Sequence, residues 1–96
     1  MRELNDIPID EYEETSKEEY SVILFDYLFQ SYDEVLGQIM KAISCSMELS
    51  EHIINVVKKD GKALVARGGM DFARKVASVL IEIGLFVQVV KNPNSL

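Results

Sequence analysis

The pattern of apolar and polar residues divides the body of this chain into six short elements. Residues 20–25, YSVILF, are mostly β-branched or aromatic, which is typical of a strand. Two stretches with apolar residues at helical spacing follow. The predicted elements, in order, are a strand at 20–25, helices at 31–43 and 46–60, a strand at 63–67, a helix at 70–83 and a strand at 85–90.

Residues at the predicted helix ends support these assignments. Ser31 and Glu34 have the spacing of a capping box, in which each side chain binds the backbone amide of the other residue. Ser46 is suited to cap the second helix. Gly61 and Gly84 are placed to end the second and third helices, because glycine readily adopts the left-handed conformation of a helix stop.

The apolar stripes of the helices predict which faces are buried. In the second helix we expect the buried face to comprise Leu49, Ile53, Val56 and Val57. In the third helix we expect it to comprise Phe72, Ala73, Val76, Val79, Leu80 and Ile83. A three-stranded sheet with the helices on one face buries every stripe. The order β-α-α-β-α-β therefore predicts an α+β fold, a two-layer sandwich.

Acidic residues concentrate before the first predicted strand. Residues 1–19 hold eight acids against Arg2 and Lys17, a net charge of −6, whereas eight acids balance eight bases from Tyr20 onward. We expect residues 1–18 to form a flexible acidic tail, either solubilising or partner-engaging, residues 19–91 one domain, and residues 92–96 a short C-terminal tail. Nucleic acid is not expected as a partner, because no region supplies a net basic field.

Other features bear on location and chemistry. No apolar run approaches the ~20 residues that span a bilayer, so no membrane contact is expected. The first residues lack the apolar core of a secretory signal, and the single Cys45 cannot form an internal disulfide, which predicts a cytoplasmic protein. His52 is the only histidine. Without a nucleophile–base pair, a metal cluster or a phosphate loop, neither an enzyme nor a cofactor is expected.

Four segments carry a resemblance to a known family. They are the strand YSVIL, the helix start Tyr32-Asp33-Glu34-Val35, the run Val57-x-x-x-Gly61-Lys62-Ala63, and Asp71-Phe72-Ala73. Over 20–90 the chain resembles the ClpS family, adaptors that bring substrates to AAA+ Clp unfoldases, with a fold shared by the C-terminal domain of the ribosomal stalk protein. The resemblance implies a non-catalytic adaptor that binds the N-terminal domain of a Clp unfoldase and modulates or delivers substrates. The alternative is a divergent interaction module of this fold with no Clp or N-degron role.

The resemblance also implies a ligand pocket. ClpS proteins bind the free amino group and bulky first side chain of an N-degron, with Asn-Asp after the first strand and a histidine late in the second helix. The matching positions here are Asp26-Tyr27 and Lys58. Lys58 offers only donors and a positive charge, so it would repel a ligand ammonium. We expect Lys58 either to pair with Asp26 or to extend into water.

The apolar side of the implied pocket is better matched. Tyr32, Ile54 and Val57 stand at positions that line the pocket in the family, and the ring of Tyr32 is large enough to fill it. A substrate protein or peptide N-terminus therefore stays a candidate ligand of an altered pocket. The implied pocket residues are Asp26, Tyr27, Tyr32, Ile54, Val57 and Lys58.

The resemblance further implies a docking surface for the unfoldase at the start of the third helix. Asp71 keeps the acidic residue of the family there. Val76 stands where a lysine is expected, and Lys75 lies beside it. The predicted docking residues are therefore Asp71, Lys75 and Val76. The N-terminal extension of the family takes part in engaging the unfoldase, and residues 1–18 are the matching segment.

Overall fold

The computed structural model describes residues 18–93 and contains six elements in the predicted order. They are β1 (Tyr20–Phe25), α2 (Tyr32–Ile43), α3 (Met47–Asp60), β2 (Lys62–Gly68), α4 (Met70–Ile81) and β3 (Val87–Lys91). The α+β class and the order β-α-α-β-α-β are confirmed. Most of the predicted acidic tail, residues 1–18, and most of the predicted C-terminal tail, residues 92–96, lie outside the described residues.

The three strands form one antiparallel sheet in the order β2-β1-β3. The first strand is therefore the central one, and it pairs with β2 from Tyr20↔Gly68 to Phe25↔Lys62. The pairing shifts register between Val22 and Ile23. On its other side β1 pairs with β3 without interruption.

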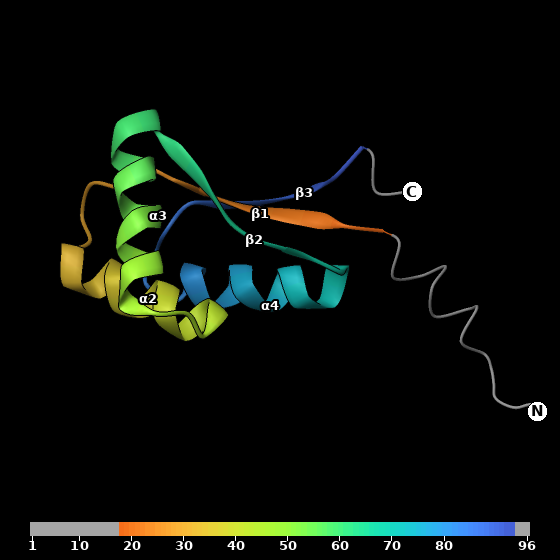
Figure 1. Ribbon diagram of the computed structural model, residues 1–96, viewed down its shortest axis with the longest axis horizontal. Helices are drawn as coiled ribbons and strands as arrows, with labels where there is room; N and C mark the ends of the chain where they lie inside the picture. Colours follow the sequence, from red (N-terminus) through yellow and green to blue (C-terminus); the bar gives the residue numbers. More distant parts are fainter. Residues whose placement is uncertain (1–17, 94–96) are drawn as a thin grey trace, which may run out of the picture.

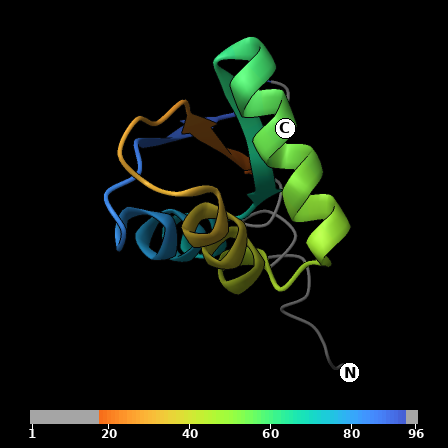
Figure 2. The same cartoon turned by 90° about the vertical axis from the view of Figure 1, so that its left-hand side faces the viewer.

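All three helices lie on one side of this sheet, as the prediction requires (Figure 1). α4 runs beneath the strands, and α3 stands at one end of the sheet, where it packs mainly on β2 (Figures 1 and 2). The core lies between the layers. Its fully buried large side chains are Val22, Leu24, Val35, Ile39, Val57, Val76 and Leu80. Burying this apolar surface is the main force that joins helices to sheet.

The predicted caps at Ser31, Ser46 and Gly61 are present. The Ser31 hydroxyl accepts from the Glu34 amide at 3.1 Å, and the Glu34 carboxylate accepts from the Ser31 amide at 3.0 Å. The Ser46 hydroxyl likewise accepts from the Leu49 amide at 3.1 Å. Gly61 ends α3 with φ +86°, and its amide donates to the Val57 carbonyl at 2.8 Å. These caps satisfy orphan backbone groups at the helix ends.

Element ends differ from the prediction around the third helix. α4 ends at Ile81, and the chain turns before Gly84, which has φ +84°. Leu85 is buried, but β3 begins only at Val87. The turn occupies residues that were assigned to the helix and the strand, because a pattern of apolar residues does not distinguish a buried turn residue from a strand residue.

Two residues predicted on buried helix faces are exposed. Leu49 is 44% exposed, while its neighbour Ser50 is fully buried and its hydroxyl donates to the Leu36 carbonyl of α2 at 2.9 Å. The crossing of α2 and α3 therefore rotates this face by one residue. Phe72 is 45% exposed, and its ring lies at the end of β2 against Gly68, where a Cβ would lie 2.7 Å from the ring.

Candidate functional site

The loop between β1 and α2 is held in place at both ends. The Asp26 amide donates to the Gly61 carbonyl at 3.0 Å, at the end of α3. The side-chain amide of Gln30 donates to the Ile83 carbonyl at 2.7 Å, in the turn after α4. The loop therefore joins two parts of the chain that are remote in sequence, and it carries two of the six predicted pocket residues, Asp26 and Tyr27.

Lys58 of α3 forms an ion pair with Asp26 of this loop. The Lys58 ammonium donates to Asp26 Oδ1 at 2.8 Å and to the Tyr27 carbonyl at 3.1 Å. It also lies 3.7 Å from the centroid of the Tyr27 ring, a cation–π geometry. Of the two alternatives that the sequence left open, pairing with Asp26 is the one adopted.

The Lys58 ammonium affects the pKa of both Asp26 and Tyr27. The Lys58 hydrogen bond, with a second one from the Tyr27 amide at 2.8 Å, lowers the pKa of Asp26. Burial raises the pKa of Tyr27, and the charge of Lys58 opposes that rise. Both members of the pair are about half exposed, so its net contribution to stability is small. Its main effect is to occupy the carboxylate, the carbonyl and the ring with an internal cation.

Two residues that were predicted to form the apolar wall of the pocket are buried in the core. Ile54 is 2% exposed and Val57 is fully buried, and both belong to the core cluster together with Tyr27. Tyr32 is 46% exposed and does not fill an interior pocket. Loss of hydration, the charge of Glu51 and a hydrogen bond to it raise the pKa of Tyr32. Three of the six predicted pocket residues therefore contribute to the core and present little surface to a ligand.

An exposed apolar cluster beside the ion pair was missed by the sequence reasoning. Leu28 is 87% exposed, Phe29 93% and Phe86 77%. We call these three residues the apolar rim. They border a hollow of about 140 Å³ whose other lining residues are Asp26, Tyr27, Gln30 and Gly84. Leu28-Phe29 in a predicted loop was a usable signal, because bulky apolar residues are uncommon in such loops. Phe86 could be placed beside them only by the fold.

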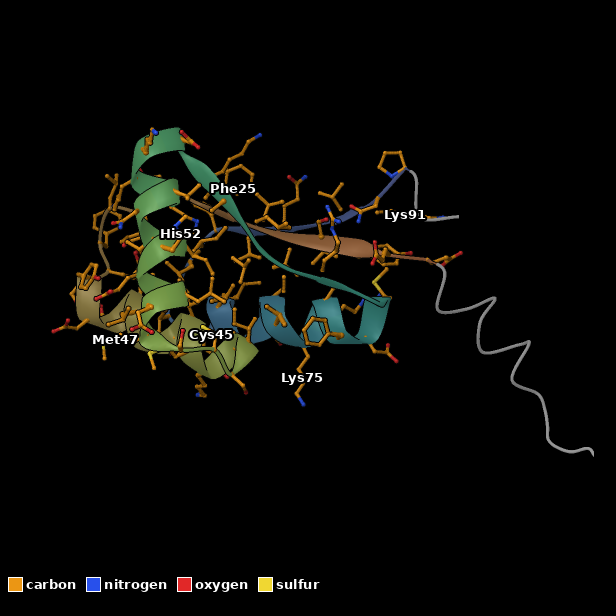
Figure 3. All side chains as sticks on the ribbon, viewed as in Figure 1. Phe25, Cys45, Met47, His52, Lys75 and Lys91 are labelled. Carbon is orange, nitrogen blue, oxygen red and sulfur yellow. The ribbon has the colours of Figure 1, made fainter. Side chains whose placement is uncertain are left out.

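The predicted docking residues separate into two groups. Asp71 and Lys75 are exposed one turn apart on α4, and the Lys75 side chain points away from the sheet (Figure 3). Val76 is 1% exposed and packs in the core. Val76 therefore offers no surface to a partner, and only Asp71 and Lys75 stand where a docking contact can form.

The remaining reactive residues stand apart from one another. Cys45 lies partly buried between α2 and α3, and His52 is exposed on α3 (Figure 3). Within residues 18–93, no three side chains of His, Cys, Asp or Glu are grouped so that they could hold a metal ion. No helix in that range is long and apolar enough to cross a membrane.

Comparison with known proteins gives a family and a fold. Residues 15–83 match the family model described as ATP-dependent Clp protease adaptor protein ClpS. A solved structure of Agrobacterium tumefaciens ClpS2 bound to L-phenylalaninamide superimposes with a TM-score of 0.73 at 16% sequence identity, covering 79% of this chain and 99% of that one. No curated protein matches this chain. At this identity the structural likeness concerns the fold, while the family model covers most of the sequence.

Proposed function

The chain belongs to the ClpS family of Clp protease adaptors, and on that premise we propose that it is a non-catalytic adaptor with an altered ligand site. In this proposal it binds the N-terminal domain of a AAA+ Clp unfoldase and delivers or modulates protein substrates for degradation. The protein acts through contacts with other proteins, and it is located in the cytoplasm. The family match over residues 15–83 supports the adaptor role.

The observation that carries the altered site is the position of the Lys58 ammonium. It contacts Asp26 Oδ1, the Tyr27 carbonyl and the Tyr27 ring, which are the groups that a ligand ammonium would need. A second cation at the same place would meet a like charge at close range, which is unfavourable. We therefore propose that ligands bind without a requirement for a free amino terminus.

The apolar rim is the proposed contact for the ligand side chain. Leu28, Phe29 and Phe86 are exposed around a hollow, while Ile54 and Val57 are closed inside the core. Burying a bulky exposed side chain in such a place contributes about 1.5–3 kcal/mol. A ligand with a large apolar residue can therefore gain affinity at the rim even though it gains none at the ion pair.

Peptide binding tests the ligand site. Fluorescence anisotropy would compare peptides that begin with Phe, Leu, Tyr or Trp, each with a free and with an acetylated amino terminus. We expect equal binding of both forms and a loss of binding for Phe29→Ser. Val90→Ser is the matched control, because Val90 is also exposed but pairs with Ser21 at the opposite end of β1 from Asp26. Binding that needs the free amine and disappears in Asp26→Ala would refute this part of the proposal.

A separate experiment tests the unfoldase contact. The isolated N-terminal domain of a Clp unfoldase would be titrated with the full chain and with the charge reversal Asp71→Lys. We expect binding that the reversal weakens about tenfold, because an interface charge placed opposite its like costs more than 1 kcal/mol. Asp33→Lys, at the start of α2, is the control. The buried Val76 favours one competitor, a ClpS-fold module without a Clp role, and no binding of the domain would support it.

A further inference from the structure

The face of the sheet opposite the helices is apolar and is not covered by any described element (Figure 1). Register and strand alternation place Ile23 and Phe25 of β1, Leu64 of β2 and Val90 of β3 on this outer face. Leu64 is 47% exposed and Val90 40%. These side chains, together with Val56 at the edge, border a hollow of about 470 Å³. An open apolar hollow of this kind commonly marks an interaction surface.

The charged side chains at the outward positions of the strands are all positive. Lys62 and Arg67 of β2 occupy outward positions opposite Phe25 and Ser21, so they stand near the two ends of the outer face. The outward positions of the three strands carry no acidic residue. The face is therefore an apolar centre between two bases, which suits an occupant with apolar residues between acids.

The size of the face favours a short occupant. Three strands about 4.8 Å apart and about six residues long, at about 3.3 Å per residue, cover roughly 14 by 20 Å, or ~300 Å². A stable interface between two proteins buries about 800 Å² on each partner. Stacking two copies through this face would therefore be weak. A segment of five or six residues matches the area, and a covalent tether would supply the missing affinity through an effective concentration in the millimolar range.

We infer that the occupant is the N-terminal segment of this chain, with Ile7-Pro8-Ile9 seated on the outer face. This apolar triplet lies between Asp6 and Asp10, and Glu11 follows it. The acids face Lys62 and Arg67. Tyr20 begins β1, so the segment enters the sheet beside Ser21, at one end of the face. The ten residues from Ile9 to Glu18 reach about 30 Å, enough to turn back along a face about 20 Å long.

Paramagnetic broadening in the full-length protein tests this inference. A spin label is placed on Asn5→Cys in a Cys45→Ser background, with Cys45→Ala as the second background if the serine protein is unfolded. We expect the amide signals of Ile23, Leu64 and Gln88 to lose most of their intensity, while those of Arg74 and Lys75 on the far side of α4 keep theirs. The double substitution Ile7→Ser/Ile9→Ser should restore the lost signals. Leu4→Ser, which removes an apolar residue outside the triplet, should not.

The remaining outcomes overturn the inference. Unchanged signals at Ile23 and Leu64 would show that the face is empty or holds another partner. Broadening that survives Ile7→Ser/Ile9→Ser would show that the triplet does not hold the segment in place. A mixing experiment detects a second copy. Spin-labelled protein at natural nitrogen abundance is mixed with nitrogen-15 protein that carries no spin label, and broadening seen only in this mixture would show that a second copy supplies the occupant. The test is independent of unfoldase or peptide binding, so it can fail while the proposed adaptor role stands.

Discussion

Gln30 and Ile83 are 53 residues apart in the sequence, yet the side-chain amide of Gln30 donates to the Ile83 carbonyl at 2.7 Å. The same amide nitrogen would lie 3.1 Å from a Cβ placed on Gly84. This contact joins the loop after β1 to the turn after α4. It therefore brings Leu28 and Phe29 to the same hollow as Phe86.

Substitution Gln30→Ala is expected to weaken ligand binding more than it weakens the fold. Loss of one neutral hydrogen bond should lower the free energy of unfolding by about 1 kcal/mol. Without this hydrogen bond the loop should no longer hold Leu28 and Phe29 beside Phe86, which should reduce peptide affinity in the anisotropy assay. Ser21→Ala is the control, because the Ser21 hydroxyl donates to Asn92 Oδ1 at 2.7 Å, at the opposite end of β1 from the loop. Equal losses of affinity in the two variants would contradict the role given to Gln30.

Asp26 should titrate below the ordinary carboxyl value, and Lys58 should be the main reason. The pKa of Asp26 is lowered first by the Lys58 hydrogen bond and then by the Tyr27 amide. Because the folded pKa lies below the unfolded one, the stability this group contributes is present above about pH 4 and is lost as pH falls through the folded pKa. Lys58→Met should raise the Asp26 pKa and reduce that acid-dependent loss.

Carboxyl carbon shifts followed by NMR against pH would measure this effect. Glu82 serves as an internal control, because its pKa is lowered by Lys41 and then by Gln38. Its midpoint should therefore be the same in the native protein and in Lys58→Met. An Asp26 midpoint that does not move in Lys58→Met would show that the ion pair does not form in solution.

The buried face of α3 can be checked with two alanine substitutions. Ile53 is 4% exposed and Leu49 is 44% exposed, although both were predicted to be buried. Ile53→Ala should lower the free energy of unfolding by about 2–5 kcal/mol, because it leaves a cavity in the core. Leu49→Ala should cost less than about 1 kcal/mol, as at other surface positions. Urea denaturation measures both losses of unfolding free energy. Similar losses would mean that α3 packs on the core through the face that includes Leu49.

Two glycine substitutions should change stability in opposite directions. Gly37 lies exposed within α2, and a Cβ there would meet no atom within 4 Å, so Gly37→Ala should stabilise the protein by about 0.5–1 kcal/mol. Gly61 has φ +86° at the end of α3, where a side chain is strained, so Gly61→Ala should cost about 1–2 kcal/mol. Thermal unfolding would compare them, and a stabilising Gly61→Ala would exclude the left-handed cap.

Local features were predicted well from the sequence. The capping box of Ser31 and Glu34, the cap at Ser46 and the stop at Gly61 all formed. Each depends on residues within four positions of one another, so short-range backbone chemistry decides it. The order of the elements and the single helical layer followed from the same patterns, because each apolar stripe needs a partner to bury it.

Features that join distant residues were decided by the tertiary structure. Leu49 and Phe72 became exposed because helix rotation depends on packing partners such as Leu36 and Gly68. The same packing placed the Lys58 ammonium beside Asp26, 32 residues away in the sequence. It also buried Ile54 and Val57, which were predicted to line the pocket. The sequence thus determined which elements form and where their caps lie, through interactions spanning a few residues. The relative placement of those elements, which sets the ion pair and the apolar rim, depended on how the whole core fits together.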